Sequence, residues 1–335
     1  MDIHLIERDP DAFQQPVSIE HIKAMCVRAF GASITLESIR ELDGGSINNT
    51  YLIGLAGMPG VILRVAQAPS NARALEIEGD LLRRELHMQP FFAPIAALIP
   101  RTLMADFTHQ LVDRDYVFQT CMPGEIWSEI YDDLTPPEQA SLWRQLGHIA
   151  RQIHSVAGTA FGPPYPRRSF PTWSAAVIAG LEGVRRDLEG YQLDTTEVNN
   201  TLDLVATHAR LLDAVTQSRL LHGDLWLRHL FVQRGPEGPT IVGLIDAEFA
   251  SWGDPLFEWT LIRLALLAPA GSEPFWETYG RLDQSVETQF RAKVYQAWSL
   301  GGSLAETWRL KNHEDHTWVR NKLREVTATL QRLIR

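Results

Sequence analysis

The sequence predicts an α+β protein in which a small β-rich lobe is followed by a larger, mainly helical lobe. Segments rich in β-branched and aromatic residues are concentrated before residue 121, whereas apolar residues at helical spacing dominate after it. The pair Pro123-Gly124 separates the two patterns and favours a joint at this point. We therefore expect an N-terminal lobe at residues 1–121, a C-terminal lobe at residues 122–335, and a ligand site between them.

The N-terminal lobe is expected to begin with a helix at residues 18–30. Ser18 can cap this helix, and Gly31 ends it. A second helix is predicted within this lobe at residues 71–86, where leucines recur at helical spacing. Segments with β-forming side chains and turn residues between them predict four strands, at residues 34–42, 50–55, 61–65 and 116–121.

The C-terminal lobe is expected to be built mainly from long helices. Two short apolar runs, 229–233 and 241–245, are predicted to be strands, because the turn-forming sequence Gly-Pro-Glu-Gly-Pro at 235–239 separates them. Helical spacing of apolar residues predicts helices at residues 136–155, 173–189 and 197–215, and residues 287–333 are also expected to be mostly helical.

Composition excludes several classes of protein. The 335 residues include 41 acidic and 31 basic side chains, a net charge of −10, whereas proteins that bind nucleic acid usually show the opposite balance. No apolar run reaches the roughly 18 residues of a membrane span, and no signal peptide is visible. Two cysteines, Cys26 and Cys121, are too few for a disulfide framework. We expect a cytoplasmic protein without nucleic-acid or membrane partners.

Three polar side chains are predicted to meet at one end of the strand pair. If the two strands form a hairpin, His229 at the start of the first lies beside Asp246 at the end of the second. The loop that carries Asp224 opens at the same end. An apolar ribbon that fixes such groups suits phosphoryl transfer, which depends on positioning and on neutralising charge with Mg²⁺.

These motifs resemble a known family. The segments Leu-His-Gly-Asp-Leu-Trp (221–226), Gly-Leu-Ile-Asp (243–246) and Gly-Asp-Pro (253–255) are similar, in sequence and spacing, to those of the aminoglycoside phosphotransferases and choline kinases. The resemblance covers about residues 42–268. It implies the two-lobed protein-kinase-like fold, with a small antiparallel sheet in the N-terminal lobe. It also implies ATP-dependent transfer of the γ-phosphate to a hydroxyl of a small molecule such as an aminoglycoside, a sugar or an amino alcohol.

The resemblance assigns roles to the acidic residues. Asp224 would be the catalytic base that accepts the proton of the acceptor hydroxyl, and Asp246 would bind Mg²⁺. His222 and Asp254 would hold the loops in place. Without the resemblance, Asp224 is better explained as a turn aspartate that bonds its own backbone, and Asp246 is also compatible with a helix cap.

One position departs from the family pattern. Five residues after the catalytic aspartate the family usually has an asparagine that is a second metal ligand, and here the residue is His229. Imidazole is a softer ligand than an amide oxygen. Either this metal site is weakened, or Mn²⁺ is better tolerated, or His229 holds phosphate, or it is an ordinary core histidine.

The same resemblance places the nucleotide phosphates at a loop of the N-terminal lobe. Glycines allow a backbone to approach phosphate closely, although Gly-Gly is also a common hairpin turn. The residues of this loop that would contact the nucleotide are Gly44, Gly45, Ser46 and Asn49.

A basic residue and a hinge strand complete the implied nucleotide site. Arg64 would contact phosphate and pair with an acid on the following helix, with Glu78 as the first candidate and Glu76 as the second. Gln119 and Cys121 lie on the strand that leads to the joint, whose backbone would hold adenine.

The acceptor and its site stay open. Trp226 is close enough in sequence to Asp224 to contact an acceptor, and the acids of residues 182–194 could serve a cationic one. A pseudokinase that binds nucleotide or acts as a scaffold without turnover is the alternative, favoured by His229. A protein kinase is disfavoured, because Gly-Asp-Pro at 253–255 is followed directly by an apolar helix. The oligomeric state is not predicted.

Overall fold

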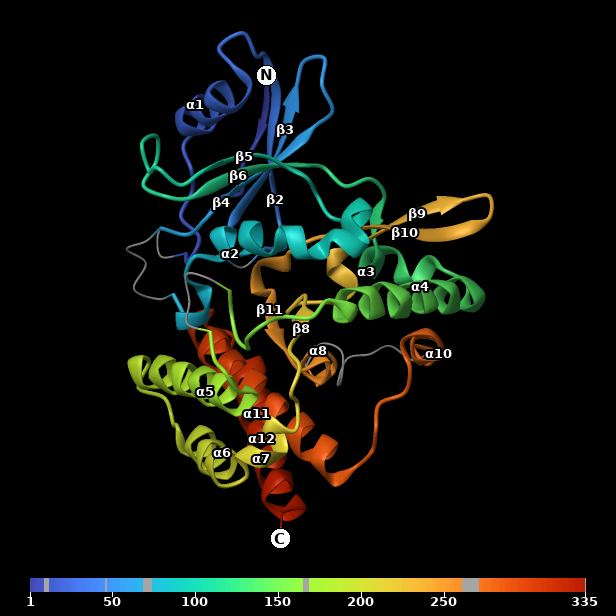
Figure 1. The fold of residues 1–335 in the computed structure, drawn as a ribbon. Helices are drawn as coiled ribbons and strands as arrows, with labels where there is room; N and C mark the ends of the chain where they lie inside the picture. Colours follow the sequence, from blue (N-terminus) through green and yellow to red (C-terminus); the bar gives the residue numbers. More distant parts are fainter. Residues whose placement is uncertain (9–11, 46, 69–73, 165–168, 261–270, 335) are drawn as a thin grey trace.

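The computed structural model describes residues 1–335 except 9–11, 46, 69–73, 165–168, 261–270 and 335 (Figure 1). The N-terminal sheet lies at one end of the molecule, and a group of long helices lies at the other. The two-lobed α+β fold predicted from the sequence is confirmed. None of the described helices is long and apolar enough to cross a membrane.

The N-terminal lobe is a six-stranded sheet in the order β1-β2-β3-β4-β6-β5. All neighbouring strands are antiparallel except β1 and β2, which are parallel. The four predicted strands are present as β2, β3, β4 and β6, whereas β1 and β5 were not predicted. The strands are β1 (Asp2–His4), β2 (Leu36–Leu42), β3 (Asn49–Leu55), β4 (Val61–Val65), β5 (Thr102–Asp106) and β6 (Tyr116–Thr120).

Helix α1 (Ile19–Phe30) is present as predicted, and it covers one face of this sheet. The side chain of Ser18 accepts a hydrogen bond from the amide of His21 at 3.2 Å, and Gly31 ends the helix with φ 92°. Buried side chains of α1 pack against the buried face of β3, whose residues alternate between the core and the surface. This packing holds the strands that carry the nucleotide-site candidates.

The second helix of the N-terminal lobe is shorter than predicted. Part of the predicted range, 71–86, lies outside the described residues. A 3₁₀ turn, η1 (Glu76–Glu78), comes first, and the helix α2 (Leu81–Met88) begins only after Asp80, whose φ of 58° breaks the helix. The 3₁₀ segment η2 (Gln89–Leu98) follows and packs with helices of the other lobe.

The C-terminal lobe is mainly helical. The predicted helix at 197–215 is wrong in its continuity, because His208 breaks it into two. Residues 287–333 are mostly helical, as predicted, and form two helices with a break at Lys311, which has φ 57°. The helices are α3 (Trp127–Ile130), α4 (Pro136–Ser155), α5 (Trp173–Gly190), α6 (Thr196–Thr207), α7 (Ala209–Asp213), α8 (Pro255–Thr260), α10 (Pro274–Tyr279), α11 (Val286–Arg309) and α12 (His313–Leu333). Three further 3₁₀ turns are η3 (Tyr131–Asp133), η4 (Leu227–His229) and η5 (Ala247–Phe249).

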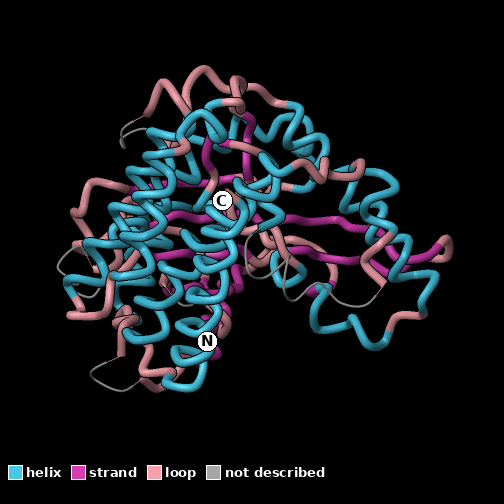
Figure 2. The backbone as a smooth tube through the Cα atoms, turned by 90° about the horizontal axis from the view of Figure 1, so that it is seen from below, coloured by secondary structure: helices cyan, strands magenta, loops and turns pink. Residues whose placement is uncertain are grey.

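Two apolar cores hold this lobe together. One joins α5, α6, α11 and α12, and the other joins α4 and η2 to a β-hairpin. Seen from below, helices lie in front of the strands of the sheet (Figure 2). The second core fixes the hairpin against α4, and the hairpin carries two of the candidate site residues.

The predicted hairpin is present, with a tighter turn than expected. Strands β9 (Leu230–Gly235) and β10 (Gly238–Leu244) are antiparallel, and the turn has only two residues between them. The short strand β7 (Glu125–Ile126) pairs with β9. A second pair, β8 (Arg219–Leu221) with β11 (Ser251–Gly253), was not predicted.

Candidate active site

The β9–β10 hairpin brings His229 and Asp246 together. The strands pair as far as Leu230 and Leu244, so the residues just beyond them lie at the same end. Asp246 then takes a left-handed conformation with φ 69° and ψ 48°. Nε2 of His229 lies 3.4 Å from Oδ2 of Asp246.

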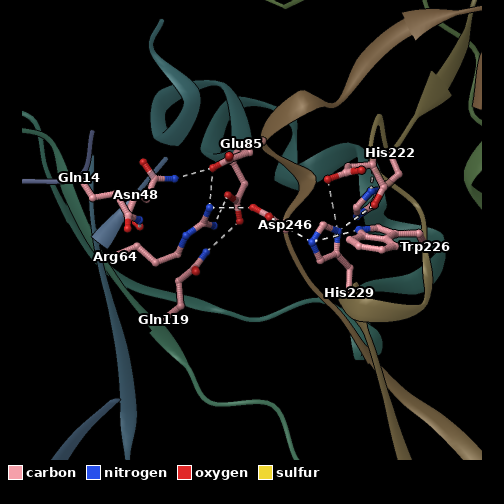
Figure 3. Close-up of polar contacts among 11 residues, drawn as sticks. Gln14, Asn48, Arg64, Glu85, Gln119, His222, Trp226, His229 and Asp246 are labelled. Atoms are coloured by element: carbon pink, nitrogen blue, oxygen red, sulfur yellow. Dashed lines mark hydrogen bonds and ion pairs between the residues drawn. The ribbon is translucent and has the colours of Figure 1, made fainter. Parts of the chain in front are cut away.

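Asp224 lies on the other side of the same imidazole. Nδ1 of His229 is 2.9 Å from the main-chain oxygen of Asp224 and 3.6 Å from Oδ2 of its carboxylate. Figure 3 shows His229 between Asp246 and the loop that carries His222 and Trp226. The three side chains predicted to meet at this end of the hairpin therefore do so.

A buried carboxylate that was not predicted anchors the loop of Asp224. Glu258, in α8, accepts hydrogen bonds from the amides of His222 and Gly223, both at 2.8 Å. Burial raises the pKa of Glu258, but hydrogen bonding from His154 and the charges of His154 and His222 outweigh it and hold the pKa below its usual value. The loop is thus tied to a carboxylate that stays ionised.

Gly223 allows this loop to pass close to the segment after β10. Its φ is 84°, and a Cβ atom there would lie 2.2 Å from the main-chain oxygen of Phe249. The β8–β11 pair brings the two segments side by side, because Leu221 is paired with Ser251. Asp254, just beyond β11, accepts hydrogen bonds from the amide of Leu256 at 3.1 Å and from the hydroxyl of Tyr295 at 2.8 Å.

Arg64 on β4 links the N-terminal sheet to this site. Its Nη2 atom donates to Asp246 at 2.9 Å and to Glu248 at 2.5 Å, while Nη1 donates to Glu85. Burial lowers the pKa of Arg64, but the three carboxylates more than offset it and raise the pKa above its usual value. Figure 3 shows Glu85, from α2, directed at this guanidinium.

The predicted pair of Arg64 with Glu78 is wrong, and Glu85 takes that place. Glu78 lies in η1, where its carboxylate binds Nη1 of Arg309 at 2.5 Å in a pair with side-chain exposures of 3% and 0%. The second candidate, Glu76, binds Arg186 through two contacts of 2.8 Å. The break at residue 80 explains the error, because α2 starts later and presents a residue from its second turn to β4.

Glu248 is a further site residue that was not predicted. It follows Asp246 by two residues and accepts a hydrogen bond from Nδ2 of Asn48 at 2.6 Å. Burial raises its pKa well above the usual value, with a further rise from Asp246, and Arg64 opposes both. The Asp-x-Glu spacing after β10 was the signal available in the sequence.

The glycine loop reaches the site, but one of its predicted members does not. Gly44 has φ 100°, and it lines the cavity together with Gly45 and Asn48. Asn49 is buried on the opposite face of β3, where its side chain binds Glu41 at 3.1 Å and also Arg114. Neighbouring residues of a strand point to opposite faces, and this alternation explains why Asn48 lines the cavity in place of the predicted Asn49. Ser46 lies outside the described residues.

The strand before the joint also lines the cavity. Gln119 is buried, and its Nε2 atom donates to Glu85 at 3.1 Å, so it supports the carboxylate that holds Arg64. Cys121 is an exposed free thiol at the edge of the cavity. Both predicted hinge residues therefore lie at the cavity wall.

A cavity of about 1030 Å³ lies between the two lobes. Its walls include Arg64, Asp224, His229 and Asp246, and it continues between α5 and α11. Of the acids at residues 182–194 considered for a cationic acceptor, Asp187 lines the cavity. Trp226 also lines it, beside His229, with ring centres 5.6 Å apart.

Two groups of ligand atoms within the described residues could hold a metal ion. In the first, made of Glu85, Asp246 and Glu248, the guanidinium of Arg64 already contacts all three carboxylates. The second is made of Asp224, His229 and Asp246. Because Nδ1 of His229 faces a carbonyl, we assign the hydrogen to it, which leaves Nε2 as an acceptor. Nε2 lies 3.4 Å from the indole N–H of Trp226 and 3.4 Å from Oδ2 of Asp246. Two electron-rich atoms this close, Nε2 and Oδ2, favour a cation between them.

Comparisons with known proteins agree with this geometry. The model of a family described as "Phosphotransferase enzyme family" matches residues 38–298. No curated protein matches the sequence. Among solved structures, a thermostable mutant of aminoglycoside phosphotransferase APH(4)-Ia with ADP and hygromycin B is similar, with a TM-score of 0.67 and 18% identity over 92% of this chain and 98% of that one. The complex of APH(2″)-IIIa with GDP and kanamycin has a TM-score of 0.62 and 16% identity over 92% and 99%.

Proposed function

Because the chain belongs to the phosphotransferase enzyme family, we propose that it transfers the γ-phosphate of ATP to a hydroxyl group of a small molecule. The observation that carries this proposal is the meeting of Asp224, His229 and Asp246 at the wall of the inter-lobe cavity. The similar structures with ADP, AMP-PNP or GDP bound support a nucleotide in this cavity.

Asp224 is the catalytic base in this proposal. Its carboxylate takes the proton of the acceptor hydroxyl while the hydroxyl oxygen bonds to the γ-phosphorus. The bond from that phosphorus to the β–γ bridging oxygen breaks, and ADP leaves with the bonding electrons. Glu258 holds the two amides before Asp224 and so fixes the distance between base and phosphate.

Asp246 and His229 are the proposed metal ligands. The carboxylate of Asp246 suits Mg²⁺, and Nε2 of His229 adds a nitrogen ligand that Mn²⁺ accepts more readily. When bound, the ion neutralises phosphate charge. Arg64 keeps Asp246 in place through its hydrogen bond of 2.9 Å.

The N-terminal lobe, which we place at residues 1–121, supplies the remaining nucleotide contacts. The glycine loop at Gly44 and Gly45 covers the phosphates, and the chain at Gln119 and Cys121 lies beside adenine. The free thiols of Cys26 and Cys121 suit a reducing, cytoplasmic location.

In this proposal, the substrate that accepts the phosphate is a small molecule with a hydroxyl group. Hygromycin B and kanamycin are bound in the similar structures, and this cavity continues past Asp224 between α5 and α11. A panel of aminoglycosides, sugars and amino alcohols, tested for ADP formation with Mg²⁺ or Mn²⁺ and with ATP or GTP, identifies the substrate class.

Replacement of the base tests the proposal. Asp224→Asn should lower kcat by about 10²–10⁴-fold, because general-base catalysis contributes that much, while ADP affinity stays within about threefold. Asp203→Asn, an exposed residue of α6, is the control. Full turnover by Asp224→Asn on a substrate of the wild type would refute the assignment of the base.

The second candidate is a pseudokinase, favoured by the histidine at position 229. Such a protein binds nucleotide but forms no ADP with any acceptor. Calorimetry of ADP and AMP-PNP, run beside the acceptor panel, separates the two: binding with turnover supports the kinase, and binding without turnover across the panel supports the pseudokinase.

A further inference from the structure

Arg228 lies between the catalytic loop and the glycine loop. It is the middle residue of η4, between Asp224 and His229 in sequence, and its side chain lines the cavity. The carbon of its guanidinium is 5.5 Å from the ring centre of Trp226. Its Nη2 atom would lie 3.3 Å from a Cβ atom built on Gly44. The side chain therefore spans from η4 to the loop proposed to cover the nucleotide phosphates.

Arg228 carries a charge that no side chain in the described part of the chain neutralises. Among the residues that the structure describes, no carboxylate forms an ion pair with it, whereas Arg64 contacts three. A guanidinium stays protonated at any physiological pH, and five N–H groups are available to a ligand. An exposed cation that faces a cavity with several carboxylates, yet pairs with none, is available for an anionic ligand.

The position of this cation points to the terminal phosphate. Burial raises the pKa of the Cys121 thiol, and the charge of Arg40, another arginine at the cavity wall, opposes this rise, so Arg40 lies near the strand that leads to the joint. Arg228 instead lies one residue from His229 and next to Gly44, at the end of the cavity where Asp224 and Asp246 meet.

Packing already restricts the guanidinium to this region. The aromatic face of Trp226 attracts the cation, and Nε1 of Trp226 lies 3.4 Å from Nε2 of His229. Trp226 thus connects Arg228 to the imidazole beside both catalytic carboxylates. A side chain held in this way loses less conformational freedom when it binds phosphate.

We propose that Arg228 binds the γ-phosphate of the nucleotide and stabilises the negative charge of the phosphoryl group during its transfer. This inference rests on the proposed kinase function. Arg228 exchanges no proton or electrons, and it acts as a fixed positive charge with a fork of donors that matches phosphate oxygens. It adds positive charge beside the position where the family's usual asparagine is replaced by His229.

A comparison of ADP with AMP-PNP distinguishes binding of the γ-phosphate by Arg228 from a general effect on nucleotide affinity. ADP lacks the γ-phosphate and AMP-PNP carries an analogue of it, so Arg228→Ala should leave ADP affinity within about threefold. It should weaken AMP-PNP about 10–100-fold, the range expected for hydrogen bonds between charged groups. Isothermal titration calorimetry with the full chain and Mn²⁺ or Mg²⁺ measures both affinities.

Turnover provides a second readout. With an identified acceptor, Arg228→Ala should lower kcat by about 10²–10³-fold, as removal of one preorganised donor does. Arg228→Lys should recover part of the AMP-PNP affinity but little of kcat, because lysine lacks the planar fork. Free guanidinium ion should partly restore the alanine variant. Arg234→Ala, an exposed arginine of the same hairpin that pairs with Glu125, is the control and should leave all values unchanged.

The possible results are distinct. An equal loss of ADP and AMP-PNP affinity in Arg228→Ala, or no loss of either with full kcat, would overturn the role of Arg228 and leave the kinase proposal standing. A wild-type protein that binds neither nucleotide would overturn both. A selective loss of AMP-PNP affinity supports the inference even if no acceptor has been found.

Discussion

The completely buried carboxylate of Glu258 accepts a 2.8 Å hydrogen bond from the main-chain nitrogen of His222, two residues before the proposed base. The two residues are 36 positions apart in the chain. Glu258 also takes the next amide, from Gly223, so a single side chain fixes the direction in which the loop presents Asp224.

Glu258→Gln should destabilise the protein by about 2–4 kcal/mol. The glutamine side chain has one acceptor oxygen, so its NH₂ group must face one of the two backbone N–H groups, donor against donor. Urea unfolding monitored by tryptophan fluorescence measures the change. Glu237→Gln, at the exposed tip of the hairpin, is the control. Equal stability of the Glu258→Gln variant and the wild type would mean that these two hydrogen bonds contribute little.

Replacement of Glu85 should change nucleotide affinity, whereas replacement of Glu78 should change the stability of the fold. Glu85→Gln removes the charge beside Arg64 and Gln119 at the cavity wall, so ADP affinity should fall about tenfold, roughly 1.4 kcal/mol. Glu78→Gln removes the carboxylate that pairs with the buried Arg309 and should destabilise the fold by about 3–5 kcal/mol, with ADP affinity retained. Calorimetry and urea unfolding of both variants test this division. A loss of ADP affinity in Glu78→Gln, together with a loss of stability alone in Glu85→Gln, would mean that Glu78 and not Glu85 supports the nucleotide site.

His229→Asn should change which metal ion the nucleotide site prefers. The nitrogen ligand of the wild type favours Mn²⁺ over Mg²⁺ relative to an amide oxygen, so the variant should reduce the Mn²⁺/Mg²⁺ ratio of ADP affinities about tenfold, roughly 1.4 kcal/mol. Calorimetry with each ion gives this ratio without any turnover. An unchanged ratio would mean that His229 is not a ligand.

Asp187 should make stability depend on pH. Burial raises the pKa of Asp187 to about 6, although its hydrogen bond from the amide of Glu76 opposes the rise. The folded protein therefore binds a proton more tightly than the unfolded chain. Stability from this group is fully present below the unfolded pKa near 3.8 and is lost as pH rises toward 6.

Asp187→Asn keeps an acceptor for the amide of Glu76 and removes the charge. The variant should be more stable than the wild type above pH 6, by on the order of 2 kcal/mol, and equally stable near pH 4. Urea unfolding across this range measures both curves. A variant that is less stable than the wild type at pH 7 would show that the ionised carboxylate is stabilising there.

The loop that carries Asp224 and the hairpin could be predicted because their signals are local. Two short apolar runs, a turn of glycine and proline between them, and polar residues at fixed offsets specify which ends of the strands meet. The same reasoning identified Asp224, His229 and Asp246, and the structure brings them together.

The partners of these residues could not be predicted, because they come from distant segments. Glu85 was missed since the start of α2 depends on the left-handed residue Asp80, and a helix two turns out of place presents a different acid to Arg64. Glu258 follows the third family motif but contacts the first, and only the β8–β11 pairing reveals that neighbourhood. Strands β8 and β11 have only three residues each, too few for an alternation of apolar and polar residues to be recognised in the sequence.

Contacts of η1 with two arginines attach the segment before α2 to the helical lobe. Arg186 and Arg309 clamp the start of the segment that leads into α2, and Met88 at its other end is buried in the core with α4. Glu85 is thus attached to the helical half of the molecule, whereas Arg64 is carried by the sheet. Any rotation that widens the cleft pulls this ion pair apart, so Glu85 holds Arg64 in position only while the two halves are closed together.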